Sequence, residues 1–596
     1  MGFYDIIKPL EVTVMHLRKT KTANGRIYLA IVDSFYDKQK KMSRSKTIES
    51  LGYLDELQKI YEDPVAHFQK RVEQLKIAKN TRQAPVNFTF YDSDRLCTND
   101  TSLRKNFGYA ALSQIYHELE IDKFLINRQR HSKEAFDANT IMKLLVYSRL
   151  LAPASKKSSF DKKERFFEKT DYSLDDVYRC LSFFDRQKEN LPVWLNGKIK
   201  ENYGRDASLI YYDVTNYYFE SDGQNDFLRK GISKEHRPNP IVQMGLFMDN
   251  NGIPITYELF PGNTNDCLTY RPNFGRIKKE FELGRVICVA DKGMTTGDNI
   301  WYTINTPSKD GYVFSMSIRG ADKEMKKYVL EEEGYTWLGT EYKRKSRNYP
   351  RTIQVTSQAG RKLKKTVHEK QVVFWSEKYA KRAKADRAAA LIKAADLAKN
   401  PGNYTRATSY GTARYVKKVD YDKDTGEILT ASSLLEIDEE KLREEESLDG
   451  YYVLLTSEME EPDDKIIDMY RGLWRIEESF KVTKSELEAR PVYVWKREHI
   501  EAHFLTCFVA LTIARILEMK LGRKYSIGKL LDSLSLAECS LVQQNYYLFD
   551  YYDEVLKDIG AALGIDFSKR IRTLGEIKKV LASTKKQKIH HENMTK

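Results

Sequence analysis

Three acidic residues, Asp213, Asp291 and Glu477, are candidates for holding divalent metal ions. Carboxylate oxygens suit Mg²⁺ or Mn²⁺, and two such ions can activate a water or a 3′-hydroxyl and stabilise the leaving oxygen of a phosphodiester. Asp213 lies in an apolar, strand-like run, where an unpaired charge is costly, and Asp291 closes a second apolar run. Taken singly, each aspartate is better explained as a strand cap or turn former. The pair, on two neighbouring strands, favours a metal site.

The third carboxylate lies in a segment with helical periodicity from about Asp463 to Leu487. Tyr470, Glu477 and Lys484 are each seven residues apart, and a step of seven returns to nearly the same helix face, about 20° short. The three residues therefore form one stripe. Apolar neighbours would pack this stripe against a sheet, namely Leu473, Trp474 and Phe480. A solvated amphipathic helix explains the period at least as well, so periodicity alone does not select Glu477 over Glu478.

The elements that must position these residues follow a definite order along the chain. Three strand-like runs come first, and the turn between the second and third contains Asn251 and Gly252, a pair that accepts positive φ and favours a hairpin. A helix, a fully apolar strand, a short helix and another strand follow. The strands and the first helix are predicted at residues 208–219, 241–248, 253–260, 268–281, 285–291 and 311–319. This order is the start of a ribonuclease-H-like α/β core.

Changes in predicted secondary structure and composition divide the chain into six regions. They are a small α+β module (1–95), a helical DNA-binding region (96–205), the first part of the core (206–320), a mainly β insertion with a basic helix (321–449), the second part of the core with the glutamate helix (450–520) and a helical, basic C-terminal region (521–596). Within the first module, strands are expected at 26–35 and 46–52, and a helix from 55 to about 82.

Composition narrows the class of protein. The chain of 596 residues has 99 Lys and Arg against 85 Asp and Glu, a formal charge of +14, which suits a polyanionic partner such as double-stranded DNA. Six cysteines without a C-x-x-C pair argue against a zinc site or a disulfide framework and fit a reducing cytosol. The longest apolar stretch, residues 504–514, is shorter than the roughly 20 residues of a membrane helix, so no membrane partner is expected.

Several motifs together resemble a known family. Tyr470, Glu477 and Lys484 fit the pattern Y-x-x-R-x-x-x-E-x-x-x-x-x-x-K, and the text Trp-Arg-Ile-Glu-Glu around Glu477 is typical of the group. Asp213-Val-Thr and Asp291-Lys-Gly resemble the two aspartate motifs that precede this signature in the family. Further matching text lies at 48–54, 233–234, 240–245 and 260–266. From about residue 20 to 517, the chain resembles DDE transposases with the YREK signature, in the insertion sequence four superfamily and its subgroup named for insertion sequence sixteen thirty-four.

This resemblance implies a ribonuclease-H-like core interrupted before the glutamate helix and cut-and-paste transposition with Mg²⁺. Residues 291 and 477 are 186 positions apart, against 78 between 213 and 291, as an insertion requires. In the family, the signature Tyr and Lys contact the terminal phosphate, roles that fall here to Tyr470 and Lys484, and cleavage passes through a DNA hairpin. The expected partners are the terminal inverted repeats and target DNA. A homodimer on the paired ends and a place in the prokaryotic cytoplasm, at the nucleoid, are also expected.

One signature position departs from the family pattern, because the Arg is Leu473 here. Arg471 and Arg475 are the candidates to replace its phosphate contact, although a displacement of two residues turns a side chain about 200° around the helix. A second basic group near the first strands is expected to contact phosphates; it consists of Arg229, Lys230, Lys234 and Arg237.

Two weaker signals have plainer explanations. The Lys- and Arg-rich helix around 381–387 is either a DNA contact or a solvated stripe. His499 and His503 lack the zincin arrangement and are expected on a surface or packed helix. Two alternatives to a transposase remain open from the sequence: a ribonuclease-H-like structure-specific nuclease, and a catalytically inactive descendant that only binds DNA.

Overall fold

The structure of the protein is a computed structural model. It describes residues 14–22, 25–37, 42–81, 88, 91–93, 104–130, 132–220, 223–231, 234, 238–399, 416–421, 432–437, 439–543 and 545–586. The chain divides into two compact units, Met1–Cys97 and Thr98–Lys596.

The N-terminal unit is a three-stranded antiparallel sheet with a helix packed on it. The strands are β1 (Val14–Lys21), β2 (Ile27–Asp37) and β3 (Met42–Tyr53), in the order β1-β2-β3. The helix expected from residue 55 is divided into α1 (Leu54–Leu57) and α2 (Pro64–Thr81). The strands expected at 26–35 and 46–52 are present as β2 and β3, whereas β1 is an addition. Its sequence is mostly polar, and Met15 is the β1 residue buried in the small core with Ile31 and Val72.

The second unit is built on a nine-stranded sheet, which makes the protein a mixed α/β structure. The sheet order is β10-β11-β12-β15-β9-β8-β5-β6-β7. Strands β5 (Leu209–Tyr218), β6 (Ile241–Asp249) and β7 (Pro254–Pro261) form the expected antiparallel meander, with Gly252 at φ +71° in its hairpin. After α9 (Asp266–Glu280), β8 (Ile287–Ala290) pairs parallel to β5; after α10 (Gly297–Ile304), β9 (Gly311–Met316) pairs parallel to β8.

The segment marked as an insertion contributes strands to this same sheet. β10 (Thr336–Trp337), β11 (Tyr342–Thr356) and β12 (Lys362–Ser376) continue the sheet beyond β15 (Tyr451–Thr456), which lies between β12 and β9. The basic helix expected in this segment is α12 (Glu377–Lys399), and β13 (Val416–Tyr421) pairs with β14 (Ser432–Ile437) in a separate ribbon. Two further helices are α11 (Lys323–Leu330) and α13 (Glu439–Ser447).

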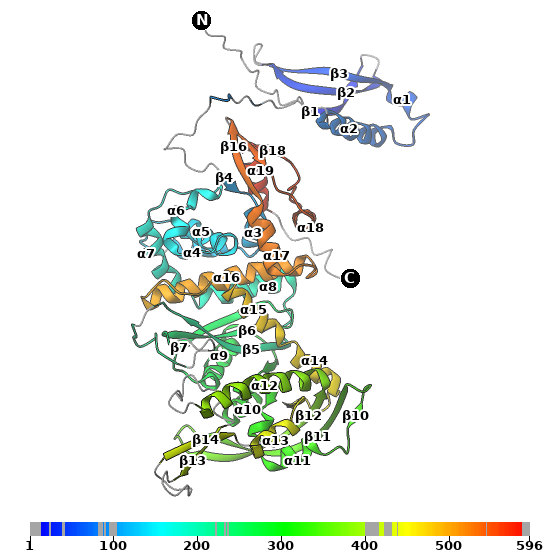
Figure 1. Cartoon of the computed structure of the whole chain (residues 1–596). Helices are drawn as coiled ribbons and strands as arrows, with labels where there is room; N and C mark the ends of the chain where they lie inside the picture. Colours follow the sequence, from blue (N-terminus) through cyan, green and yellow to red (C-terminus); the bar gives the residue numbers. More distant parts are fainter. Residues whose placement is uncertain are drawn as a thin grey trace. The chain divides into compact units, whose positions relative to one another are not determined.

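Helices cover both faces of the sheet. The region before β5 is helical as expected; its helices are α3 (Tyr109–Glu118), α4 (Ile121–Gln129), α5 (Ala138–Leu151), α6 (Lys156–Asp161), α7 (Leu174–Asp185) and α8 (Asn190–Tyr203). Figure 1 shows α16 (Arg497–Lys520) running between these helices and the sheet, and it contacts α3, α5, α7 and β7. Within the described residues, α16 is long and apolar enough to cross a membrane, but its apolar stretch is wholly buried, as in a core helix.

The single long helix predicted from Asp463 to Leu487 is instead two helices. α14 (Asp463–Arg471) and α15 (Trp474–Lys484) are joined through Gly472 and Leu473, where backbone bonds tighten from i−4 to i−3. A Cβ on Gly472 would lie 1.9 Å from the Tyr211 hydroxyl oxygen of β5. The close approach to β5 therefore requires glycine at the junction.

The C-terminal region, predicted to be helical, contains strands as well as helices. Besides α17 (Ile527–Leu536), α18 (Glu554–Leu563) and α19 (Leu574–Thr584), it contains β16 (Glu538–Gln543), β17 (Tyr546–Phe549) and β18 (Ile571–Thr573). These strands join β4 (Arg104–Asn106) in a four-stranded sheet of order β18-β17-β16-β4. Because β4 is remote in sequence, local periodicity does not reveal its pairing with β16.

Candidate functional site

Asp213 and Asp291 lie at the same level on neighbouring parallel strands. Tyr212 of β5 is paired with Ala290 of β8. The residue that follows Tyr212 is Asp213, and the residue that follows Ala290 is Asp291. Asp291 follows the last residue of β8 and begins a short 3-10 turn. The two aspartates therefore lie side by side: Asp291 follows the carboxyl end of β8, and Asp213 lies within β5, one residue beyond the last β5 residue paired with β8.

Asp213 is half-buried in β5, and its electrostatic surroundings identify its neighbours. Burial raises the pKa of Asp213 to about 6, and the negative charges of Asp291 and Glu477 contribute to the rise. The ammonium of Lys234 and the backbone N–H of Val214, which donates to Oδ1 over 2.7 Å, oppose it. Asp291 and Glu477 are thus both within electrostatic range of Asp213.

Asp291 is oriented by two hydroxyl groups. The Ser315 hydroxyl of β9 donates to its Oδ1 over 2.8 Å, and the Tyr470 hydroxyl of α14 donates to the same oxygen over 3.3 Å. Burial, and then the nearby Asp291 charge, raises the pKa of Tyr470, so the phenol stays protonated and can donate. Ser315 is a functional candidate that sequence inspection missed, because nothing in its strand text distinguishes it.

The structure separates Glu477 from its neighbour Glu478. The Glu478 carboxylate accepts a hydrogen bond of 3.0 Å from Arg515 of α16, whose side chain is 5% exposed. Arg515 also bonds Glu518 over 2.8 Å and the Ser479 hydroxyl over 2.7 Å. Glu478 is therefore committed to the contact between α15 and α16, whereas Glu477 acts electrostatically on Asp213.

Lys484 and Lys234 lie beside Asp213. Burial lowers the pKa of Lys484 to about 8, with repulsion from Lys234 adding to the fall and Asp213 opposing it. The Lys484 ammonium is 5.6 Å from the centre of the Tyr217 ring on β5, and Lys234 donates to the carbonyl of Val214. Of the signature residues, Tyr470 thus lies beside Asp291, and Lys484 lies near Asp213.

The residues at and around the signature Arg position make contacts away from the three carboxylates. Leu473 is 5% exposed and packs in the core. Arg475 donates to the Tyr211 hydroxyl over 3.3 Å, and Arg471 pairs with Asp468 over 3.2 Å. The structure places neither arginine in contact with the three carboxylates.

Asp266 is a fourth carboxylate that sequence reasoning did not single out as a ligand. It is the first residue of α9, burial raises its pKa, and Lys234 opposes the rise, so it lies near the same ammonium as Asp213. It lies within the quoted motif at 260–266, which is the signal that could have found it.

The other basic candidates are scattered. Arg229 pairs with Asp226 over 3.4 Å on the outer part of the loop after β5, Lys230 lies next to it, and Arg237 is outside the described residues. On α12, Arg387 is buried in an ion pair of 2.6 Å with Asp449, a structural role. His503 is buried, and its Nε2 lies 3.0 Å from the carbonyl oxygen of Ala489, which agrees with the packed helix expected.

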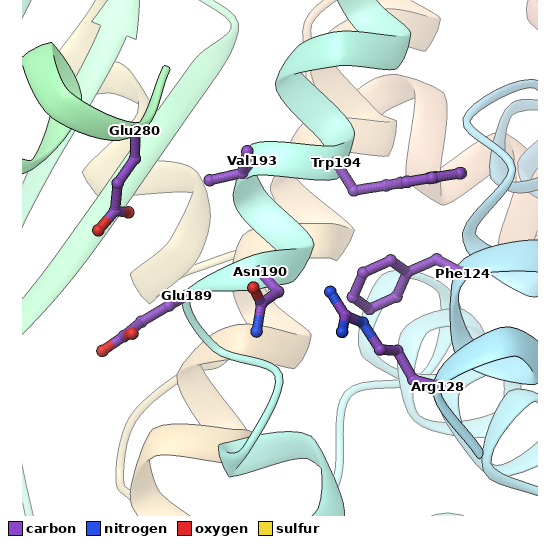
Figure 2. Close-up of a pocket in the computed structure, with 7 residues that line it drawn as sticks. All are labelled: Phe124, Arg128, Glu189, Asn190, Val193, Trp194 and Glu280. Atoms are coloured by element: carbon purple, nitrogen blue, oxygen red, sulfur yellow. The ribbon is translucent and has the colours of Figure 1, made fainter. Parts of the chain in front are cut away.

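An open pocket of about 470 Å³ lies elsewhere, between the helical region and the end of α9 (Figure 2). Its lining comes from α4, α8 with the residue before it, and α9: Phe124, Arg128, Glu189, Asn190, Val193, Trp194 and Glu280. None of these residues belongs to the carboxylate site.

The donor chemistry of the carboxylate site fits a metal. Across the described part of the chain, no three His, Cys, Asp or Glu side chains converge closely enough to form a ready-made metal cage. The donor set is nevertheless all oxygen, the kind that hard divalent cations prefer. The mutual repulsion that helps raise the pKa of Asp213 is the repulsion that a bound cation would relieve. The residues are therefore suited to a divalent cation.

Two family models match the chain. One describes the transposase DDE domain and matches residues 206–513; the other describes the N-terminal domain of IS1634 family transposases and matches residues 17–86. The protein is thus an enzyme of the DNA transposase class, and this class depends on divalent metal ions. Within that class the chain belongs to the DDE transposases of the IS1634 family, which confirms the resemblance found in the sequence.

Comparison with other proteins adds little beyond the family. A search of curated proteins gave no match. Among solved structures, the chain is similar to a piggyBac transposase in its synaptic complex with hairpin DNA, with 9% identity, a TM-score of 0.36, and coverage of 82% of this chain and 87% of that one. It is also similar to the Mos1 transposase paired-end complex with the left transposon end, with 13% identity, a TM-score of 0.11, and coverage of 42% and 64%.

Proposed function

We propose that the protein excises and reinserts its own insertion sequence, with Asp213, Asp291 and Glu477 as the ligands of two Mg²⁺ or Mn²⁺ ions. The observation that carries this proposal is the side-by-side position of Asp213 and Asp291 on parallel strands, with the Glu477 charge close enough to raise the pKa of Asp213. Its DNA substrates are the terminal inverted repeats and the target.

The catalytic core proposed for this chemistry is ribonuclease-H-like. Its support is the run β9-β8-β5-β6-β7, in which the antiparallel meander lies on one side of β5 and two parallel strands lie on the other. We retain the bounds of the six regions, with 96–205 as the DNA-binding region and 321–449 as the insertion, and the C-terminal region contains both helices and strands.

The metal ions, when bound, would activate the attacking oxygen and stabilise the leaving oxygen of the phosphodiester. The protein's own contribution is to fix the ligands and the substrate. Tyr470 and Ser315 hold one oxygen of Asp291, and the other oxygen would be available to a metal ion. Lys484 and Lys234 place positive charge beside Asp213, where a scissile phosphate would lie.

Other parts of the assignment follow from the family. We assign contact with the terminal phosphate to Tyr470 and Lys484, and further DNA contacts to Arg471, Arg475, Arg229, Lys230, Lys234 and Arg237. Cleavage would proceed through a hairpin at the transposon end. Because two ends must be joined, the active form would be a homodimer on DNA, acting in the cytoplasm at the nucleoid.

The direct test is cutting of DNA bounded by the inverted repeats next to the gene, with purified protein and Mg²⁺. Wild type should release the bounded segment, and Asp213→Asn, Asp291→Asn or Glu477→Gln should stop release without preventing DNA binding. Glu478→Gln is the matched control, since it changes the adjacent carboxylate that bonds Arg515. Release by the Glu477→Gln variant at the wild-type rate would remove Glu477 from the site.

A further inference from the structure

Strands β11 and β12 form a two-stranded ribbon that continues beyond the rest of the sheet. In the described part of the chain, β10 pairs with β11 only at Lys343 and Arg344, and β15 pairs with β12 only from Lys370 to Trp375. The two long strands remain paired with each other out to Thr356 and Lys362. The outer part of this hairpin, residues 347–356 and 362–369, is called the ribbon below.

One face of the ribbon is packed and fixed. Ile353, Val355 and Val367 are buried in the core shared with α10. At the start of α10, the Asp298 carboxylate accepts hydrogen bonds from the backbone N–H of Thr356 over 2.5 Å and from its hydroxyl over 2.9 Å. The ribbon is therefore held against the core and presents its other face in a defined direction.

The opposite face, called the front face, is exposed, polar and free of acidic residues. It is formed by the alternate positions of the two strands, and its exposed members at the centre and tip are Thr352, Gln354, Lys362, Lys364, Thr366 and His368. The remaining exposed positions of this face, Asn348 and Pro350, are also uncharged. The exposed positions named here carry lysine, amide and hydroxyl groups and no carboxylate, which is complementary to a polyanion. At the tip, the Asp298 carboxylate lies against Thr356 and Lys362.

The front face lies on the side of the sheet that bears the catalytic carboxylates. Further along β12, the same alternation leads to Val372 and Phe374, which pack in one core with Tyr211 and Tyr217 of β5. Asp213 shares this alternation with both tyrosines, so its side chain leaves β5 on that side.

Contacts with α14 confirm the continuity of this side. Lys370, on the front-face alternation, pairs with Asp463 over 2.8 Å, and Arg344 pairs with Asp464. These acids begin the helix that carries Tyr470, the hydrogen-bond partner of Asp291.

We propose that the front face of the ribbon docks on the double-stranded DNA that flanks the phosphodiester held at the carboxylates. A two-stranded antiparallel ribbon has the width to enter the major groove, where lysines meet phosphates and a glutamine side chain can read a base edge. In this arrangement Lys364 contacts a phosphate and Gln354 faces the bases, whereas the Lys362 ammonium donates to the Thr356 hydroxyl beside Asp298. The proposal rests on the proposed function, because it places the DNA at the same active site.

Lys364 and Lys365 provide a matched pair for the test. They are adjacent and both exposed, but Lys364 is on the front face, whereas the Lys365 ammonium lies 5.3 Å from the Trp301 ring on the packed side. Lys364→Gln and Lys365→Gln change the net charge equally. The measurement is the binding constant for a duplex carrying the terminal repeat and for a random duplex of equal length, over a salt series from about 50 to 200 mM.

Lys364→Gln should weaken binding several-fold and make the slope of log K against log salt shallower by about 0.9, as for one lost phosphate contact, while Lys365→Gln leaves the slope unchanged. Weaker binding to both duplexes supports a phosphate contact. Weaker binding to the repeat duplex alone supports a phosphate contact that forms only in the specific complex. Equal slopes for the two variants overturn the proposal, as does a change in self-association with DNA binding intact. Wild-type cutting is measured in parallel, so failure of the ribbon is distinguishable from failure of the transposase assignment. Melting temperatures verify that both variants are folded.

Discussion

The hydroxyl of Tyr470 donates a hydrogen bond to Oδ1 of Asp291 over 3.3 Å, linking the helix before the Gly472 junction to the end of β8. The same oxygen accepts from Ser315 over 2.8 Å, so two neutral donors fix one side of the carboxylate. A ligand held in this way presents its second oxygen with little freedom, and such supporting contacts tune metal affinity.

Tyr470→Phe should therefore reduce Mg²⁺-dependent cutting by about 10-fold to 100-fold, because a hydrogen bond to a charged group contributes roughly 1.5–3 kcal/mol. The measurement is the cutting rate as a function of Mg²⁺ concentration. A shift to higher Mg²⁺ supports the role in orienting Asp291. An unchanged metal dependence with weakened DNA binding would instead leave Tyr470 with only the phosphate contact implied by the family.

Glu477→Gln and Glu478→Gln should have opposite effects. The first should abolish cutting with stability close to wild type. The second should retain cutting but lower the free energy of unfolding by about 1 kcal/mol, since Glu478 is partly exposed and Arg515 keeps its bond to Glu518. Cutting assays and denaturant unfolding decide between the two positions, and loss of cutting in Glu478→Gln without destabilisation would contradict the assignment.

Gly472→Ala should destabilise the protein by about 1–3 kcal/mol and reduce cutting, because its methyl group would overlap the Tyr211 hydroxyl oxygen, 1.9 Å away, and force α15 to move. Gly197→Ala is the control. Gly197 lies within α8, and the methyl group of an alanine there would meet no atom within 4 Å, so this substitution should stabilise the protein by up to about 1 kcal/mol. Equal unfolding free energies for the two variants would show that the junction tolerates the shift.

The parts of the site that were predictable from the sequence are those that local pattern determines. Asp213 and Asp291 lie in or directly after apolar segments that are recognisable as strands. Their adjacency follows from the core fold that the order of the predicted elements indicates. The helix break at Gly472 was not predictable, because its cause is contact with Tyr211, which lies far away in the sequence. Periodicity alone did not separate Glu477 from Glu478; the family signature selected Glu477, and the contact that occupies Glu478, with Arg515, lies on another helix.

Long-range pairing also explains what the sequence left out of the fold. β16 pairs locally with β17, but the pair joins a larger sheet through β4, more than four hundred residues earlier, and β11 and β12 join the core sheet only because β15 returns between β12 and β9. Neither relationship leaves a periodic trace in the local text. The meander β5-β6-β7 was predictable because its strands are consecutive and a sequence-coded hairpin turn joins β6 to β7.

A buried lysine gives the protein a pH-dependent stability that can be removed by mutation. Lys156 of α6 is 5% exposed and contacts Nδ1 of His503, a neutral ring because burial holds the pKa of His503 well below its usual range. Burial, and then the charge of Arg149, lowers the pKa of Lys156 from 10.5 to about 7, with Cys507 opposing the change.

Between about pH 7 and 10.5 the unfolded chain therefore binds more protons at Lys156 than the folded chain, so the free energy of unfolding should rise with pH across this window. At pH 7 and below, the folded protein bears the cost of a buried charge. Lys156→Met should stabilise it there by a few kcal/mol, at most about 5, and by progressively less toward pH 10.5. Denaturant unfolding of both proteins from about pH 6 to 9.5 tests this. A parallel pair of stability curves would mean that Lys156 keeps its ordinary pKa in the fold, for instance through water reaching its ammonium group.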